Sequence, residues 1–271
     1  MALELGLKGR TALVTGASKG IGRAIARGLA REGVNVVLMA RGMDALAATA
    51  AELTSQHGVR ALPVSADITK TDSVNAAAAA AKAEFGTVHI VVNNAGNPMR
   101  RMDRQILWPD TDWIGDLDGK LIGSLRVTQA FLPLMPGDGT GRIINISGTA
   151  STIVWAPALT HGLNNAGMNQ ATGYLANDLA SQQITVNTLV PGLVGTEGRQ
   201  VWAENMAKQQ NVTTEEFLAS FCKRMGILSG RWATMDEVAD SVLFLASDRG
   251  RYYNGAKIIM DGGLNVNVRP A

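Results

Sequence analysis

The chain has 271 residues, of which 46% are hydrophobic and 18% charged, so it can build a large core and is not expected to be disordered. Its 25 basic and 23 acidic side chains nearly cancel, which argues against a protein that binds nucleic acid or another polyanion. The only cysteine is Cys222, which excludes an intrachain disulfide and a thiolate zinc site, and we expect no metal centre.

Short β-branched runs alternate with longer helical patterns along the whole chain. The predicted strands are 11–15, 34–39, 59–65, 88–92, 142–147, 184–190 and 257–260. The predicted helices are 21–31, 44–57, 73–85, 113–134, 157–181 and 236–246. This alternation without a linker predicts one dinucleotide-binding domain over 1–271. Its fold is α/β, with a doubly wound, predominantly parallel seven-stranded sheet in a Rossmann-type α/β/α arrangement.

A glycine-rich turn joins the first strand to the first helix. Residues 15–22 read TGASKGIG. Gly16 permits a tight turn, Gly20 lets the backbone approach a pyrophosphate, and Gly22 allows close packing of the helix. The helix that follows offers free N–H groups and a positive dipole end to phosphates. At the first βα junction, this pattern predicts a dinucleotide site.

Four motifs occur in the order and at the spacing typical of the short-chain dehydrogenase/reductase family. They are TGASKGIG at 15–22, NNAG at 93–96, PG at 191–192 and DGG at 261–263. The chain resembles that family over residues 8–264, and the resemblance implies a nicotinamide dinucleotide cofactor. The positions that match the family's cofactor contacts are Gly16, Ser18, Lys19, Ile21, Gly22, Asp67, Ile68, Asn93, Ala95, Gly96, Pro191, Gly192, Val194 and Thr196.

The end of the second strand indicates which dinucleotide is bound. An acidic residue there would accept a hydrogen bond from the ribose 2′-hydroxyl and favour NAD(H). This chain has Ala40 followed by Arg41, and Lys19 lies inside the glycine turn. Two cations without a carboxylate suit a 2′-phosphate, although both side chains also fit an ordinary solvated surface. We therefore expect NADP(H) rather than NAD(H).

The chain departs from the family at the catalytic positions. The resemblance places the family's Asn, Ser, Tyr and Lys at Lys120, Gly148, His161 and Asn165. In the family, the tyrosine exchanges a proton with the substrate oxygen, the serine orients that oxygen, and the lysine lowers the tyrosine pKa. None of these residue types is retained here. The lysine and the asparagine look exchanged between two positions that face one another in the family.

Three functions remain open for Lys120, His161 and Asn165. In the leading hypothesis the protein is an NADP(H)-dependent oxidoreductase acting on a carbonyl or alcohol. His161 is its acid/base, because imidazole titrates near neutral pH, and Lys120 is its electrostatic partner, lowering the His161 pKa. In the second, the same groups stabilise an enolate in a non-redox lyase or dehydratase reaction. In the third, the site is silent and the protein is a dinucleotide-binding scaffold.

The sequence also bears on the substrate. Arg100, Arg101 and Arg104 follow the NNAG motif in a segment that approaches the active-site mouth in the family. They suit an anionic small-molecule substrate, or they are solvated surface charges. The counterpart of residues 193–232 forms a substrate lid in the family, so we expect a lid there.

Assembly and location complete the expectations. Members of the family assemble through the helices that match 113–134 and 157–181, so we expect a homo-oligomer, a dimer or a tetramer. The first ten residues lack the pattern of a secretory signal. No stretch is apolar enough to span a bilayer, so a cytoplasmic protein that contacts no membrane is expected.

Overall fold

Seven strands form one sheet in the computed structural model, which describes residues 4–96, 104–155 and 158–266. The strand order is β3-β2-β1-β4-β5-β6-β7, and every pairing is parallel. The bounds are β1 (Thr11–Thr15), β2 (Asn35–Ala40), β3 (Ala61–Ser65), β4 (Ile90–Asn93), β5 (Arg142–Ile146), β6 (Thr185–Pro191) and β7 (Lys257–Met260). The predicted sheet is confirmed, and it is parallel throughout.

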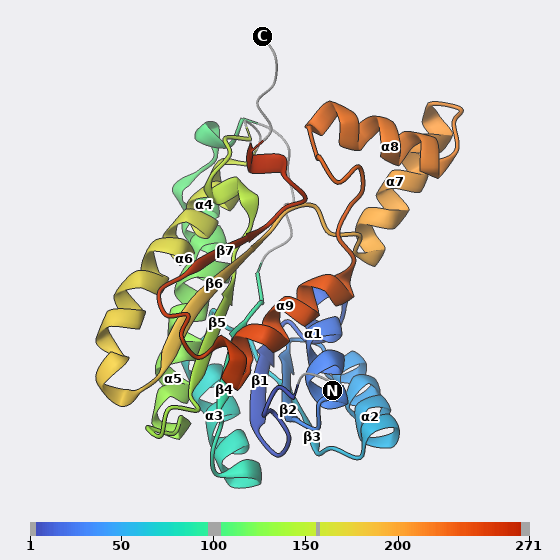
Figure 1. The fold of residues 1–271 in the computed structure, drawn as a ribbon. Helices are drawn as coiled ribbons and strands as arrows, with labels where there is room; N and C mark the ends of the chain where they lie inside the picture. Colours follow the sequence, from blue (N-terminus) through green and yellow to red (C-terminus); the bar gives the residue numbers. More distant parts are fainter. Residues whose placement is uncertain (1–3, 97–103, 156–157, 267–271) are drawn as a thin grey trace.

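Helices cover both faces of the sheet, as predicted (Figure 1). One face carries α1 (Gly20–Arg31), α2 (Met43–His57) and α9 (Met235–Ala246). The opposite face carries α3 (Thr71–Phe85), α5 (Gly123–Phe131) and α6 (Leu159–Asp178). The strand order reverses between β1 and β4, and in open α/β sheets such a reversal opens a crevice at the carboxyl ends of the strands.

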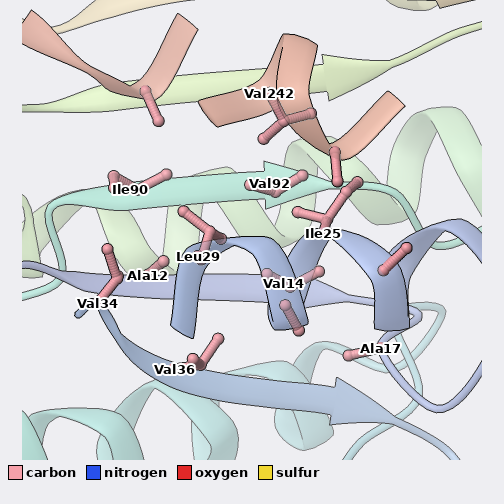
Figure 2. Close-up of a cluster of buried hydrophobic side chains, with 14 of the residues drawn as sticks. Ala12, Val14, Ala17, Ile25, Leu29, Val34, Val36, Ile90, Val92 and Val242 are labelled. Carbon is pink, nitrogen blue, oxygen red and sulfur yellow. The ribbon is translucent and has the colours of Figure 1, made fainter. Parts of the chain in front are cut away.

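Two apolar clusters, one on each face, hold the layers together. Figure 2 shows the first, in which side chains of β1, α1, β4 and α9 meet. Val14, Ile25, Leu29, Val92 and Val242 in this cluster have no exposed surface. Strands buried on both faces explain the continuous apolar runs in the sequence. The glycine turn is thus attached to a fully buried part of the sheet and α1.

The predicted helix over 113–134 differs in detail. It begins as α4 (Asp110–Leu117), widens into a π-helical segment (Asp118–Ile122), and continues as α5 before ending in a short 3₁₀ turn. π-Helical segments are rare and are often found at functional sites. This one contains Lys120. The predicted long helix is therefore present, but its sequence does not indicate the wide turn, because a single such turn leaves no mark on hydrophobic periodicity.

Residues 193–232 form two helices, α7 (Glu197–Gln209) and α8 (Thr214–Met225), which follow the carboxyl end of β6 (Figure 1). The rings of Trp202, Phe217, Phe221 and Trp232 meet with centroids 5.5–6.2 Å apart. Phe217 and Trp232 belong to a third apolar cluster, against which Phe221 packs, and this cluster is separate from the two that hold the sheet. The helix predicted over 157–181 starts at Leu159 and ends at Asp178, and Pro157 lies outside the described residues.

Candidate functional site

The glycine turn has the backbone that its sequence predicts. Gly16 and Gly20 have φ angles of +68° and +59°, a region that residues with a side chain rarely adopt. A Cβ added to Gly22 would lie 2.3 Å from the carbonyl oxygen of Gly16, so only glycine fits where α1 leaves the turn. The three glycines therefore shape the turn in the way the sequence indicates.

Asn94 fixes this turn to β4, a role that the sequence analysis did not assign. Its side-chain Nδ2 donates to the Thr15 carbonyl at 2.9 Å, and its backbone N–H donates to Thr15 Oγ1 at 2.9 Å. The neighbouring Asn93 points into the core, where its Nδ2 donates to Thr128 and Asn145 at 2.9 Å each. A cofactor contact from Asn93 would therefore come from its backbone.

The N-terminus of α1 suits a phosphate group. No acidic side chain lies in its first turn, and Lys19 at the N-cap makes no side-chain capping bond, so the N–H groups and the dipole are uncompensated. A Cβ added to Gly20 would make ordinary contacts with Glu197 and Thr196, 3.8 and 3.9 Å away, so these two residues line the space above the turn. Ser18 and Ile21 are half-buried in the same turn. These features fit a dinucleotide pyrophosphate.

Two exposed cations lie in the glycine turn and directly after β2. Lys19 and Arg41 are exposed, and within the described residues neither side chain has a hydrogen-bond or ion-pair partner. Asp67 is partly buried, and the Thr69 backbone N–H and hydroxyl both donate to it at 2.9 Å, which lowers the pKa of its carboxyl. Ile68 is different, since its side chain packs against Gly123 in the core beneath the crevice.

The motifs at the ends of β6 and β7 lie against each other. A Cβ added to Gly192 would lie 2.8 Å from the Cα of Asp261, so the PG and DGG motifs pack backbone to backbone. Pro191 ends β6, Val194 forms an isolated bridge to the segment before α9, and Thr196 is the N-cap of α7. The predicted cofactor contacts at positions 191–196 therefore follow one another along the connection from β6 to α7.

Lys120 of the π-helical segment and Asn165 of α6 are in contact. Lys120 Nζ donates to Asn165 Oδ1 at 2.7 Å, so the two positions that look exchanged in sequence are in contact. The lysine stem lies against the NNAG motif, because a Cβ added to Gly96 would be 3.1 Å from Lys120 Cδ. Ala95, which precedes Gly96 in the NNAG motif, donates its N–H to Thr15 Oγ1. The π-helical segment thus directs an ammonium group toward the crevice.

Asn165 keeps one polar atom without a partner. The residue has no exposed surface, and its Nδ2 makes no hydrogen bond. That atom faces Gly148, where an added Cβ would lie 3.2 Å from it. Ser147 does not replace the missing serine, since its hydroxyl donates to the Asn165 carbonyl at 3.0 Å. A buried donor of this kind can bind an oxygen of a cofactor or substrate.

His161 lies in the first turn of α6 in an environment that favours neutral imidazole. Burial lowers its pKa to about 4, with further contributions from the Lys120 and Arg199 cations and an opposing one from Asp116. Burial also lowers the pKa of Lys120 to about 8. At pH 7, His161 is therefore neutral and Lys120 is mostly an ammonium ion.

Other predicted residues lie away from this centre or outside the description. Arg104 is exposed, and Arg100 and Arg101 lie outside the described residues. Within residues 4–96, 104–155 and 158–266, no three His, Cys, Asp or Glu side chains gather as a metal site would require. No helix in those ranges is both long and apolar enough to cross a membrane.

Comparison with known proteins extends this description to almost the whole chain. A family model described as enoyl-(acyl carrier protein) reductase matches residues 16–265, from the glycine turn to beyond the DGG motif. The chain belongs to the short-chain dehydrogenase/reductase family. The resemblance expected from the four motifs is therefore confirmed.

Three members of this short-chain dehydrogenase/reductase family illustrate the range of similarity. Gluconate 5-dehydrogenase of Gluconobacter oxydans is 30% identical over 266 residues, 97% of each chain. Oxidoreductase UcpA of Salmonella typhimurium is 37% identical over 259 residues, 95% of each chain. The structure of L-sorbose reductase from Gluconobacter frateurii, complexed with NADPH and L-sorbose, matches with a TM-score of 0.90 at 29% identity, covering 98% of this chain and 100% of that one. These relatives are oxidoreductases.

Proposed function

We propose that this protein is an NADP(H)-dependent oxidoreductase that interconverts an alcohol and a carbonyl compound. His161 is its acid/base and Lys120 is its electrostatic partner. The observation that carries the proposal is the Lys120–Asn165 hydrogen bond of 2.7 Å beside His161. It keeps a positive charge in the centre although the family's lysine position is occupied by an amide. The oxidoreductase relatives support the reaction class.

The cofactor assignment rests on three features. The uncompensated N-terminus of α1 suits the pyrophosphate, and the unpaired Lys19 and Arg41 suit a 2′-phosphate. The L-sorbose reductase that this chain resembles is complexed with NADPH. A nicotinamide bound beside residues 191–196 would supply the hydride acceptor for alcohol oxidation and the hydride donor for carbonyl reduction.

The residues of the chain then move the proton. Neutral His161 accepts the hydroxyl proton of the alcohol, and the bond between that oxygen and its carbon becomes the carbonyl double bond as the hydride departs. Lys120 stabilises negative charge on the substrate oxygen during this step. Asn165 holds Lys120 through Oδ1 and retains Nδ2 as a donor for a ligand oxygen. In the direction of reduction, His161 returns the proton.

The reaction class can be tested by screening alcohols with NADP⁺ and carbonyl compounds with NADPH, following the ultraviolet absorbance of the reduced nicotinamide. Turnover that disappears in His161→Phe supports the proposal. Tight cofactor binding without redox turnover of any compound would contradict it and favour the non-redox or the silent scaffold hypothesis.

Arg41→Asp tests the cofactor choice. Losing a charge-assisted contact to the 2′-phosphate and adding a repulsive carboxylate should weaken NADPH binding about 10- to 100-fold, whereas NADH binding should be unchanged or stronger. Isothermal titration with both cofactors measures the difference. Arg251→Asp, at another exposed arginine, is the matched control. Equal weakening for NADPH and NADH would show that Arg41 does not bind the 2′-phosphate.

We also propose one domain over residues 1–271 in which 193–232 forms a substrate lid. The aromatic cluster of α7 and α8 supports this, since it is separate from the clusters that hold the sheet. A pocket of about 390 Å³ lies between this segment and the start of α1 and includes Gly20 and Glu197 in its wall. Lid closure over a bound dinucleotide would reduce this space.

The expected homo-oligomer remains a proposal. Helix α6 leaves Leu163 and Tyr174 51% and 67% exposed, and nothing lies within 4 Å of a Cβ added to Gly173. Exposed apolar side chains beside small residues suit close packing of a second copy. Light scattering should give the mass of a dimer or tetramer of the 28.5 kDa chain. A monomer mass at micromolar concentration would contradict this.

A further inference from the structure

Arg199 is a partly buried cation that the sequence analysis did not single out. It lies in the first turn of α7, one turn before Ala203 and two turns before Ala207, which are 0% and 2% exposed. Residues four apart lie on the same side of a helix, so Arg199 extends from the buried side of α7. Trp202, three residues after Arg199, contacts the rings of the aromatic cluster that holds α7 in place.

Arg199 is also unusual among the arginines of the structure. The other arginines of the described residues that are not exposed, Arg10, Arg23, Arg126 and Arg142, each donate at least one hydrogen bond. Arg199 is half-buried, and no side chain or backbone carbonyl in the described part of the chain accepts a hydrogen bond from it. Desolvating a guanidinium without a partner is costly, so such a group is expected to meet its partner in a ligand.

The surroundings of Arg199 concentrate positive charge. Its guanidinium acts electrostatically on His161, which also feels the Lys120 ammonium. The N-terminus of α7 adds the positive end of its dipole, which Glu197 in the first turn offsets in part. Asp116 raises the His161 pKa, and its effect is smaller than those of burial, Lys120 and Arg199, which all lower it. The centre therefore favours an anion.

We propose that the substrate carries a carboxylate, and that Arg199 binds this carboxylate while the alcohol or carbonyl group lies at His161. The proposal rests on the proposed function, because His161 defines the place of the reacting oxygen. A planar guanidinium binds a carboxylate through two parallel hydrogen bonds. Lys120 already bonds to Asn165 and would stabilise the reacting oxygen. Arg199 is then the cation that can pair with the single negative charge of the carboxylate. A hydroxy acid or an oxo acid meets this description.

A bound carboxylate also suits the proton transfer. It would offset the Lys120 and Arg199 cations and so raise the His161 pKa, which the Asp116 carboxylate already does in part. An acid/base works best when its pKa is near the working pH. The anionic substrate would thus prepare the imidazole for its own reaction.

The test uses ligand pairs that differ only in carboxylate against hydroxymethyl. The pairs are L-lactate with propane-1,2-diol of the same configuration, 3-hydroxybutyrate with butane-1,3-diol, and D-gluconate with D-glucitol. Each is titrated into the NADP⁺-loaded protein labelled with ¹⁵N-histidine. The chain has three histidines, so the His161 signal is assigned by its absence in His161→Phe. At least one acid should shift this signal saturably, and its hydroxymethyl counterpart should not.

Arg199→Met removes the charge and keeps a long apolar stem. We expect the dissociation constant of the acid to rise at least about tenfold in Arg199→Met, and less in Arg199→Lys, which keeps the charge. Unchanged NADPH affinity shows that the variant is folded, and Arg251→Met is the control for removing an exposed arginine. Inorganic phosphate is titrated as the competing anion.

The outcomes separate this inference from the proposed function. Binding of an acid that depends on Arg199, with no redox turnover, would support the carboxylate site and contradict the oxidoreductase. Turnover of a neutral alcohol at a rate that Arg199→Met leaves unchanged would support the oxidoreductase and contradict the carboxylate site. The inference is overturned if the neutral counterparts bind as well as the acids or if only phosphate binds. It is also overturned if none of the six compounds shifts the His161 signal.

Discussion

Replacing His161 by phenylalanine is expected to lower kcat for alcohol oxidation by about 10²- to 10⁴-fold, the usual contribution of a general acid or base. The dissociation constant of NADPH should change less than about twofold, because the ring occupies similar space and the cofactor contacts lie on the glycine turn. Steady-state kinetics and a cofactor titration on the same preparation measure both quantities.

The matched control is His57→Phe, which changes a histidine in the last turn of α2. It should leave both quantities unchanged. Full activity in His161→Phe would remove the imidazole from the mechanism and direct attention to Lys120, whose pKa of about 8 also permits proton transfer near neutral pH. A parallel loss of activity and NADPH affinity would instead indicate a structural role.

Lys120→Met should change the pH dependence of kcat/KM for alcohol oxidation. This reaction needs neutral His161, so the rate rises with pH through the His161 pKa, which is about 4. Removing the ammonium removes a cation that lowers this pKa, so the acidic limb should move to higher pH, toward the ordinary value of about 6.5. The alkaline limb near pH 8, where Lys120 loses its proton, should disappear.

The rate at the optimum should also fall about 10- to 100-fold in Lys120→Met, since the charge that stabilises the reacting oxygen is lost. Lys82→Met, at an exposed position on α3, is the matched control. An acidic limb that stays near pH 4, together with an unchanged alkaline limb, would show that Lys120 does not act on His161.

Most of the fold could be predicted because each signal in the sequence is local. The seven β-branched runs, the glycine turn and the spacing of the four motifs all depend on nearby residues. β7 was predicted at its observed bounds, and the glycine turn has the backbone angles that its glycines indicate. Topology followed, because parallel strands joined by helices have few acceptable arrangements.

The missing parts of the site depend on contacts between distant segments. Nothing near Arg199 in the sequence shows that it is desolvated and lacks a partner, because that depends on how α7 meets the sheet. The π-helical turn at Lys120 requires no particular residue type, so the sequence does not indicate it. Asn94 sits in a recognised motif, but its bond to Thr15 is visible only where β4 lies beside β1. Predicting these features requires the packed structure.

On the proposed alignment of the catalytic positions, Lys120, Asn165 and His161 would take the place of the family's usual residues. The cation would then come from the π-helical segment instead of α6, and it bonds to Asn165, the residue proposed at the family's lysine position. Imidazole replaces a phenol, and because its ordinary pKa is lower, it needs less help to be neutral at pH 7. At Gly148, the proposed counterpart of the family's serine, an added Cβ would lie only 3.2 Å from Asn165 Nδ2, which has no hydrogen-bond partner and is available as a donor.

The central claim is best tested by titrating the protein with NADPH and with NADH while following energy transfer from tryptophan to the reduced nicotinamide ring. The chain has five tryptophans, so the signal needs no label. We expect saturable binding of both, with NADPH about tenfold or more tighter, since one or two charge-assisted contacts to the 2′-phosphate separate them. Absence of binding by either cofactor would contradict the account, and the glycine turn would then be only a structural element.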